Sequence, residues 1–437
     1  MAIRPKLVHK SVLIITYYWP PAGGPGVQRW LKFVTYLPHF HIKPVVFVPK
    51  HATYPITDKS LKAELPNNTE IIEFPIKEPY KIARLVSRKK TRSISKGLIT
   101  ERKNQSLLEK LLLFIRGNFF IPDARVGWVA PATQFLKTYI TKHNIDTIIT
   151  TGPPHSLHLI GLGLKTELSL RWIADFRDPW TTIGYHKQLK LTQASKQKHL
   201  RFEASVLNSA DELIVTSKVT KHEFQQKTTR PITVITNGYD DETKTDFKLD
   251  SNFSIAHIGS FLSKRNPELL WRVLSEIIKE DQRFSSDFKL HLVGFVSDAV
   301  LQSLAKYNLT DYVDNVGYVS HKQSIEFQKK SQVLLLVEID SHDTKAIIPG
   351  KLFEYMVSRR PILAIGPDGS DVETIIAKTK TGFYFSHKDY KGIKSAIITL
   401  YETFKQGHLV TNPQGLAQYH RKALTHKLAE VIKGSAK

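Results

Sequence analysis

A proline and a glycine precede a cation and an acid between residues 349 and 354. Pro349 and Gly350 favour a break before a short helix, because the first turn of a helix does not need the N–H that proline lacks. The free N–H groups at a helix start attract phosphate, and Lys351 adds a full positive charge there. Glu354 follows one turn later, where a carboxylate can accept hydrogen bonds from ribose hydroxyls. This spacing predicts a site for a nucleoside diphosphate.

A second candidate site follows the first predicted strand, where Gly23, Gly24 and Gly26 stand close together. In parallel α/β sheets ligands bind beyond the carboxyl ends of the strands, and glycine lets the backbone approach a ligand closely. The spacing is not the dinucleotide fingerprint and no Walker lysine follows, so NAD-type and P-loop sites are excluded here. We interpret the segment as a ligand-binding loop; a tight turn that merely needs glycine is the alternative.

Acidic and imidazole side chains follow two other predicted strands. Asp175 and Asp178 flank Arg177 at the end of one strand, and His155 comes after the preceding one. Either aspartate could orient an acceptor hydroxyl or act as a base, and an Asp–Arg pair that fixes the loop is the alternative. His155 is a third candidate for a catalytic role, although a lone histidine is more often structural.

Basic residues follow the strand predicted at 254–258. Gly259 and Ser260 end that strand, and Lys264 and Arg265 lie in the loop before the next helix. An arginine can hold a diphosphate with two parallel hydrogen bonds. We expect at least one of the two cations to face a ligand, and the other could lie at the solvated edge.

The elements that position these residues alternate between short apolar runs and longer amphipathic stretches, which predicts parallel sheets covered on both faces. The first series has strands at 11–16, 44–48, 70–74, 147–151, 171–175, 213–216 and 233–236, and a helix at 27–36. The second has strands at 254–258, 289–293, 313–316, 332–337, 361–365 and 382–385, and helices at about 266–280, 298–306, 321–330 and 389–405.

Two sequential series of similar size predict an α/β fold with two Rossmann-like domains facing across a cleft. We expect the first domain at 1–240 and the second at 253–412, joined by a polar linker. The last segment, 413–437, is predicted to form a helix that packs back on the first domain.

The charge balance is strongly basic. Lys and Arg number 63 against 40 Asp and Glu, a net charge of +23, which attracts nucleic acid, anionic membranes or phosphorylated substrates. The absence of cysteine excludes disulfides, thiolate–metal sites and cysteine nucleophiles. The apolar run 12–15 is too short for a secretory signal, and no window approaches the roughly 18 apolar residues of a membrane span. We therefore expect a cytoplasmic location.

The segment 77–123 interrupts the alternation and mixes basic with apolar residues. Such a basic amphipathic segment can lie on the anionic inner face of a membrane. The alternative is a solvated helical excursion whose leucines belong to the core.

In order along the chain, these motifs resemble those of bacterial family-four-type glycosyltransferases with the GT-B fold. The resemblance rests on the glycine-rich first loop, Asn237-Gly238 before the linker, Gly259 to Arg265, and Glu354 from a Glu-x7-Glu motif; the segment 203–217 is also similar. It implies an N-terminal acceptor domain, a C-terminal domain that holds a nucleotide sugar, and transfer with retention of configuration.

By position, the resemblance implies that Glu354 binds the ribose, Arg265 the diphosphate, and Gly24 the phosphate or the transferred sugar. It implies neither a metal nor a cofactor beyond the nucleotide sugar as co-substrate. Three positions depart from the family pattern. Ala346 stands where the first motif glutamate is expected, Ser260 stands where a basic residue is expected, and Arg177-Asp178 occupies the region of the family's N-domain histidine.

These departures put the sugar and the general base in question. Lys345 or backbone groups could recognise the sugar in place of an acid. In retaining transfer the leaving diphosphate can take the acceptor proton itself, so a basic site for that diphosphate is the stronger requirement.

We therefore expect a retaining glycosyltransferase that moves a sugar from a nucleotide-diphosphate donor to a cell-envelope glycan or a lipid-linked acceptor. A nucleotide-sugar 2-epimerase with the same two-domain plan is the alternative, and a non-catalytic protein derived from the fold is another. The charge alone would suit a nucleic-acid-binding protein, but no helix-turn-helix, zinc or RNA-binding motif is present. We expect no nucleic-acid partner.

Overall fold

The computed structural model describes residues 10–78, 107–240 and 247–434. The chain forms two compact units. Unit 1 comprises residues 1–237 and 421–437, and unit 2 comprises residues 238–420. The chain therefore leaves unit 1 after the Asn237 position and returns to it at Arg421.

Unit 1 contains a seven-stranded sheet in the order β3-β2-β1-β4-β5-β6-β7. Every pairing in it is parallel. The strands are β1 Lys10–Ile15, β2 Ile42–Lys50, β3 Glu70–Pro75, β4 Thr147–Gly152, β5 Arg171–Phe176, β6 Glu212–Val215 and β7 Ile232–Val234. The strand order reverses between β1 and β4, which is where open α/β sheets leave a crevice for a ligand.

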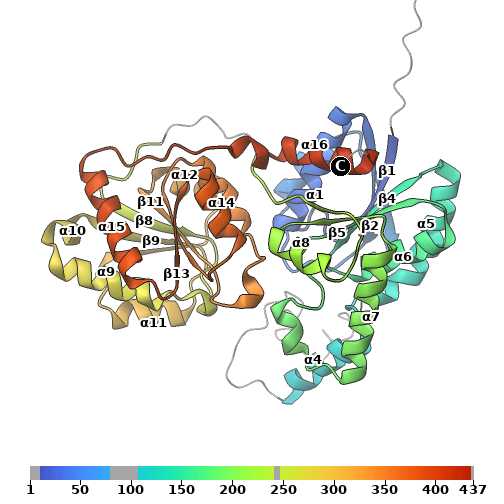
Figure 1. The fold of residues 1–437 in the computed structure, drawn as a ribbon, viewed down its shortest axis with the longest axis horizontal. Coiled ribbons are helices and arrows are strands. Elements are labelled where there is room, and N and C mark those ends of the chain that lie inside the picture. Colours follow the sequence, from blue (N-terminus) through green and yellow to red (C-terminus); the bar gives the residue numbers. More distant parts are fainter. Residues whose placement is uncertain (1–9, 79–106, 241–246, 435–437) are drawn as a thin grey trace, which may run out of the picture. The chain divides into compact units, whose positions relative to one another are not determined.

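Helices cover both faces of this sheet (Figure 1). They are α1 Pro25–Tyr36, α5 Val129–His143, α6 Ser156–Glu167, α7 Gln193–Ser209, α8 Lys218–Gln225 and α16 Arg421–Lys433. A further helix, α4 Leu107–Phe119, packs against the 3₁₀ turn Gly184–Leu189. Alternate residues of β1 enter opposite cores: Leu13 and Ile15 pack towards α5 and α6, and Val12 and Ile14 pack towards α1 and α16. Burial on both faces explains why the strands read as unbroken apolar runs.

The C-terminal helix α16 packs on unit 1, as the sequence predicted. Leu424, Leu428 and Ile432 belong to the same core as Trp30 and Val34 of α1, and Figure 1 shows α16 alongside α1. The helix begins later than expected. Residues 416–419 form a 3₁₀ turn, and the structure leaves the chain up to 420 in unit 2.

Unit 2 contains a six-stranded parallel sheet in the order β10-β9-β8-β11-β12-β13. Its strands are β8 Phe253–Ile258, β9 Phe288–Val293, β10 Val313–Gly317, β11 Val333–Val337, β12 Ile362–Gly366 and β13 Gly382–Ser386. Its helices are α9 Glu268–Glu280, α10 Gln282–Asp287, α11 Asp298–Lys306, α12 His321–Lys330, α13 Gly350–Val357, α14 Asp371–Thr379 and α15 Tyr390–Lys405. The strand order reverses between β8 and β11.

The predicted α/β class with two Rossmann-like units is confirmed. Each strand expected from the sequence is present, with ends shifted by at most two residues. Of the basic segment 77–123, residues 79–106 lie outside the described part, and residues 107–119 form α4. Helix α14 was not anticipated.

The packing of α16 predicts a measurable stability effect. Leu428 is fully buried between α16 and α1, so Leu428→Ala should lower the free energy of unfolding of unit 1 by about 2–5 kcal/mol, from lost burial plus the cavity left behind. Urea unfolding, with hydrogen exchange followed on the peptides of α1 and α16, would measure it. The exposed neighbour Lys427 provides the control variant Lys427→Ala. Equal behaviour of the two variants would contradict the assigned packing.

Candidate functional site

Helix α13 places the predicted cation and acid on unit 2. Pro349 is the N-cap residue, so it lies just before the helix and not inside its first turn. Gly350 is the first helical residue. The buried face of α13 is anchored to the end of β8, because the Tyr355 hydroxyl contacts both backbone groups of Ile258, its N–H at 2.9 Å and its carbonyl at 3.3 Å. The anchor holds Lys351 beside the loop that follows β8.

The Lys351 ammonium lies directly against Gly259. Gly259 has a φ of +111°, and a Cβ there would come within 3.0 Å of Lys351 Nζ. Glycine is therefore required twice, for its backbone conformation and for the approach of the cation. Lys351 Nζ is also 3.3 Å from His257 Nε2.

Burial lowers the pKa of Lys351 to about 7. The positive charge of Arg265 contributes to this lowering, and the carboxylate of Glu354 opposes it. Arg265 is thus close enough to change the pKa of Lys351. Two of the predicted phosphate-binding cations therefore lie near each other. A ligand with several negative charges would relieve their mutual repulsion.

Arg265 ends the 3₁₀ turn Ser263–Arg265 after β8 and is half-buried. Its Nε is buried without a hydrogen-bond partner among the described residues. Burial lowers the pKa of its guanidinium, and the negative charge of Glu338 opposes this shift. Glu338 follows β11 and accepts hydrogen bonds from Ser370 at 3.1 Å and from Tyr384 at 2.8 Å. Burial raises the pKa of Glu338 to about 7.

The other predicted residues of unit 2 differ in exposure. Glu354 is half-buried and accepts a hydrogen bond of 2.9 Å from Gln328 of α12. Ser260 and Lys264 are exposed. The structure therefore groups Gly259, Arg265 and Lys351 at the carboxyl end of β8, with Glu354 one helical turn beyond Lys351.

In unit 1, the three glycines after β1 have different surroundings and roles. Gly23 donates a backbone hydrogen bond of 3.0 Å to Ile56, whose side chain would contact a Cβ at Gly23. Gly24 is the N-cap of α1 with a φ of +107°, and a Cβ there would meet nothing within 4 Å. Of the three, Gly24 leaves open space for a ligand.

Gly26 makes room for a protein side chain. A Cβ at Gly26 would overlap the Arg177 guanidinium. Arg177 Nε donates to the Gly152 carbonyl at 3.3 Å, and another guanidinium nitrogen donates to the Pro153 carbonyl. Arg177 therefore ties the loop after β4 to the start of α1.

Asp175 is fully buried and pairs with Arg29, not with the neighbouring Arg177. The Arg29–Asp175 distance is 3.0 Å. Trp30 Nε1 and the Thr151 hydroxyl donate to the other carboxylate oxygen at 2.9 and 2.8 Å. This geometry favours the alternative that the acid fixes the loops.

Asp178 and His155 are placed differently. Asp178 is half-buried, and burial raises the pKa of its carboxyl while Arg177 opposes the shift. The His155 ring stacks on Trp180 at 4.8 Å, and neither of its nitrogens has a hydrogen-bond partner among the described residues. Burial is the main cause that lowers the pKa of His155 far below its ordinary value, so the ring is neutral at neutral pH. Of the three acid–base candidates, Asp178 is the one that is not fully buried.

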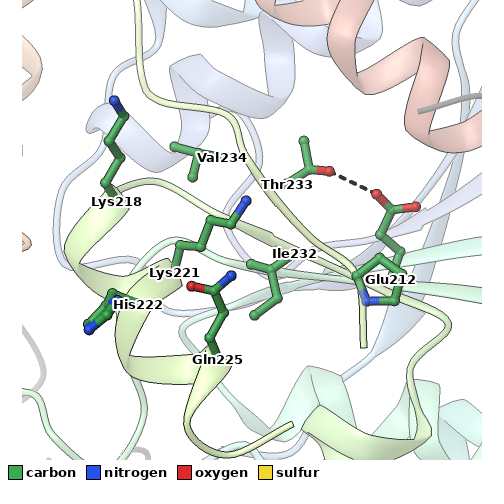
Figure 2. A pocket seen from close by; sticks show the side chains of 9 residues that line it. Glu212, Lys218, Lys221, His222, Gln225, Ile232, Thr233 and Val234 are labelled. Carbon is green, nitrogen blue, oxygen red and sulfur yellow. Dashed lines mark hydrogen bonds between the residues drawn. The ribbon is translucent and has the colours of Figure 1, made fainter. Parts of the chain in front are cut away.

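A surface cavity of about 720 Å³ lies elsewhere on unit 1, beside the edge strand β7 and helix α8. Figure 2 shows Lys218, Lys221 and His222 extending from α8, and the Thr233 hydroxyl donating to Glu212. No sequence-predicted site residue lines this cavity. Within the described ranges, no cluster of three or more histidine and acidic side chains is arranged to hold a metal ion.

Sequence reasoning missed three residues that shape these sites: Arg29, His257 and Glu338. His257 interrupts an otherwise apolar strand, and Glu338 directly follows one. A polar residue inside a buried strand was therefore the available signal. Nothing local in the sequence marked Arg29 as the partner of Asp175.

Two family models match the chain one after the other. Residues 97–243 match Glycosyltransferase Family 4, and residues 252–403 match Glycosyl transferases group 1. The second match spans the sheet of unit 2 with the loops that carry Gly259, Arg265 and Lys351. The chain belongs to the glycosyltransferases, with both of these domains in order. No curated protein sequence gave a significant match.

Solved structures share the fold of this glycosyltransferase over nearly its whole length. HepE of Anabaena, in complex with UDP and glucose, has a TM-score of 0.60 at 15% identity and covers 98% of this chain and 100% of its own. Sucrose-phosphate synthase of Thermosynechococcus elongatus has a TM-score of 0.59 at 16% identity, with 97% and 98% covered. WaaG, a glycosyltransferase involved in lipopolysaccharide biosynthesis, has a TM-score of 0.53 at 12% identity, with 97% and 100% covered.

The same fold also occurs in an isomerase. A putative UDP-N-acetylglucosamine 2-epimerase of Listeria monocytogenes has a TM-score of 0.54 at 11% identity, with 97% and 96% covered. Fold similarity alone therefore does not separate the two reactions, whereas both family models describe glycosyltransferases.

The Gly26–Arg177 contact of this glycosyltransferase can be tested directly. Gly26→Ala should push the guanidinium off the Gly152 and Pro153 carbonyls and cost about 1–3 kcal/mol of stability, the range for lost charged hydrogen bonds. Thermal unfolding would report the cost. The matched control is Gly127→Ala, where an added Cβ meets nothing within 4 Å. Identical melting of both variants would contradict the contact.

Proposed function

We propose that the protein transfers a sugar, with retention of configuration, from a nucleotide-diphosphate donor to a cell-envelope glycan or a lipid-linked acceptor. In this reaction the bond between the sugar C1 and the diphosphate oxygen breaks, and a bond from C1 to the acceptor oxygen forms. The acceptor proton passes to the leaving diphosphate or to a nearby base. We propose a cytoplasmic location for the enzyme, where nucleotide sugars are made.

The observation that carries the donor site is the pairing of Lys351 with Arg265 beside Gly259. Two cations at the carboxyl end of β8, on a backbone that glycine keeps open, provide fixed positive charge where a diphosphate leaves. Glu354, one turn further along α13, is placed to accept hydrogen bonds from ribose hydroxyls. A second HepE structure is in complex with UDP-glucose, a ligand of the same chemical class as this proposed donor.

For the acceptor side we propose Asp178 as the residue that orients the acceptor hydroxyl. It is half-buried, and its raised pKa suits proton exchange. Gly24 supplies open backbone next to the start of α1. We keep Asp175 and His155 as supports of this loop cluster, because Asp175 is saturated with hydrogen bonds and His155 is enclosed by Trp180 and Phe176.

We further propose that helix α4 rests on an anionic membrane surface. Leu113 is buried, and a Cβ at Gly117 would come within 2.7 Å of the Leu189 carbonyl, so this side of α4 packs on unit 1. The other side exposes four large apolar side chains at helical spacing, Leu111, Phe114, Ile115 and Phe119. Figure 1 shows α4 at the opposite end of unit 1 from α16.

Charge complementarity supports an anionic lipid surface as the occupant of this face. The chain carries a net charge of +23, which favours anionic lipid over a neutral or basic partner. No helix in the described ranges is long and apolar enough to cross a bilayer. Association through α4 would bring the enzyme to a lipid-linked acceptor.

Incubation with a panel of UDP- and GDP-sugars tests the reaction. Nucleoside diphosphate should be released faster with a membrane-extracted acceptor fraction than without it, and sugar analysis without acceptor should recover the donor sugar unchanged. Epimerised sugar in the absence of acceptor would support the 2-epimerase alternative. Neither release nor nucleotide binding across the panel would refute the proposal.

The donor site predicts the behaviour of two variants. Glu354→Ala and Arg265→Ala should each weaken UDP or GDP binding by about 1–3 kcal/mol, the value of a lost hydrogen bond to a charged group. Isothermal titration calorimetry would measure the affinities, with the exposed Lys279→Ala on α9 as the control. Unchanged affinity in both variants would remove the assigned donor site.

The membrane face predicts a partition difference. The double variant Leu111→Ser and Phe119→Ser removes side chains that are 52% and 72% exposed, and binding to phosphatidylglycerol vesicles should weaken by roughly 1.5–3 kcal/mol per side chain. Sedimentation with vesicles would measure binding, against phosphatidylcholine vesicles and a Val410→Ser control. Val410 is 67% exposed on unit 2. Equal binding of all variants would show that α4 is not the membrane face.

A further inference from the structure

One buried histidine of unit 2, His257, contacts Lys351 of the proposed donor site. His257 lies in β8, where every residue is buried, and is itself 1% exposed. Its ring stacks on Phe261 at 4.0 Å with an angle of 24° between the planes. Nothing in the sequence analysis or in the proposed reaction uses this side chain.

The contacts of the two ring nitrogens determine the tautomer. His257 Nδ1 is 3.1 Å from the carbonyl oxygen of Leu335. A carbonyl oxygen can only accept, so Nδ1 carries the proton and donates it. Burial is the main cause that lowers the pKa of His257 far below its ordinary value, so the ring is neutral. Nε2 is then left with a lone pair, and it faces Lys351 Nζ at 3.3 Å.

The lysine therefore has one donor directed inward and two directed elsewhere. An ammonium has three N–H donors and no acceptor. His257 Nε2 takes one of them, and the side of Nζ next to Gly259 is kept clear of a side chain. Without the imidazole, the four-carbon stem of a lysine would be free to change rotamer, since lysine side chains lose much entropy when they are fixed.

We propose that His257 is a positioning residue, which holds the Lys351 ammonium beside Gly259 so that its remaining donors meet the diphosphate of the nucleotide-sugar donor. This rests on the proposed function of unit 2. His257 does not touch the ligand and acts through Lys351. A neutral acceptor is suited to this task, because an acid at the same place would neutralise the cation before the ligand arrives.

The arrangement links donor binding to proton uptake. The groups that face Lys351 are His257 from β8, Arg265 from the turn after β8, and Glu354 from α13 itself. The Lys351 pKa of about 7 in the empty site must rise when a diphosphate binds, because an anion stabilises the ammonium. Affinity is therefore full below pH 7 and falls as the pH rises from 7 towards the pKa of the bound state. Glu338, whose pKa is also about 7, adds negative charge over the same range, so the test needs a readout specific to Lys351.

The first experiment reads Lys351 in the protein without ligand. Acylation of its amine would be followed by peptide mass spectrometry in the wild type, His257→Phe and His257→Gln. The pH would run from about 6 to about 10, which spans the Lys351 pKa of about 7 and approaches the ordinary lysine pKa. Phenylalanine keeps the ring stack and removes the acceptor, whereas glutamine keeps an acceptor oxygen. We expect the Lys351 profile of His257→Phe to shift to lower pH and that of His257→Gln to stay near the wild type. Identical profiles for wild type and His257→Phe would overturn the proposal.

The second experiment measures binding of UDP, GDP, uridine and guanosine by calorimetry at about pH 6 and about pH 8, one unit on either side of the Lys351 pKa of about 7. His257→Phe should lose about tenfold affinity for the diphosphates, because one charged hydrogen bond from Lys351 to the diphosphate would no longer be held in place. Nucleoside affinity should not change, and His257→Gln should recover most of the loss. Equal loss for nucleosides and diphosphates would indicate a merely structural role and overturn the proposal.

The two failures are distinguishable. If the wild type binds none of the four ligands, the donor site of the proposed function fails, and this inference fails with it. If the wild type binds UDP or GDP and His257→Phe binds it equally well, the positioning role alone is refuted and the donor site stands.

Discussion

A buried charge must find an opposite charge or a full set of hydrogen bonds, because desolvation otherwise costs several kcal/mol. In unit 1 this constraint is met by Asp175 and Arg29, whose side chains are 0% and 2% exposed. The carboxylate holds β5 to β4 through Thr151 and to α1 through Trp30. Arg29 extends the network to the Thr236 carbonyl beyond β7 at 2.7 Å. The loops that end β1, β4 and β5 therefore start from positions fixed by one ion pair.

Unit 2 meets the same constraint in the opposite way. Lys351 and Arg265 are both half-buried, yet within the described residues no salt bridge joins either of them to an acid; the carboxylates of Glu354 and Glu338 act on them through space. Lys351 has the neutral imidazole of His257 as its partner. Arg265 interacts with the charge of Glu338 through space, without a hydrogen bond between them. Positive charge that is desolvated and not neutralised is costly for the empty protein. In the proposed donor site the same charge would be preorganised for a diphosphate, since little reorganisation would be needed when the anion arrives.

The sequence was sufficient for the fold because most strands are short runs rich in apolar residues and are separated by amphipathic stretches, a pattern that depends on near neighbours. It was also sufficient for Lys351 and Glu354, which share one short helix. It did not reveal that Asp175 pairs with Arg29, because these residues are 146 positions apart, and the adjacent Arg177 was the plausible local partner. It also assigned Gly26 to a ligand, whereas the structure uses that space for Arg177. The misassigned residues are those whose partners come from another strand end.

The replacement of an acid by Ala346 can now be weighed against its surroundings. The nearest buried acidic residue before position 346 is Glu338. Ser370 and Tyr384 already donate hydrogen bonds to its oxygens. A Cβ at Gly366 would overlap Glu338, so the carboxylate is packed as well as hydrogen-bonded. It is therefore not available as a substitute acid. The start of α13 is left with Glu354 as its acid against the cations Lys351 and Arg265. In the proposed donor site, such a balance would favour a diphosphate over one with two acids. The sugar hydroxyls would lack that carboxylate acceptor, and they would instead accept from Lys345 or pair with backbone groups of the same loop.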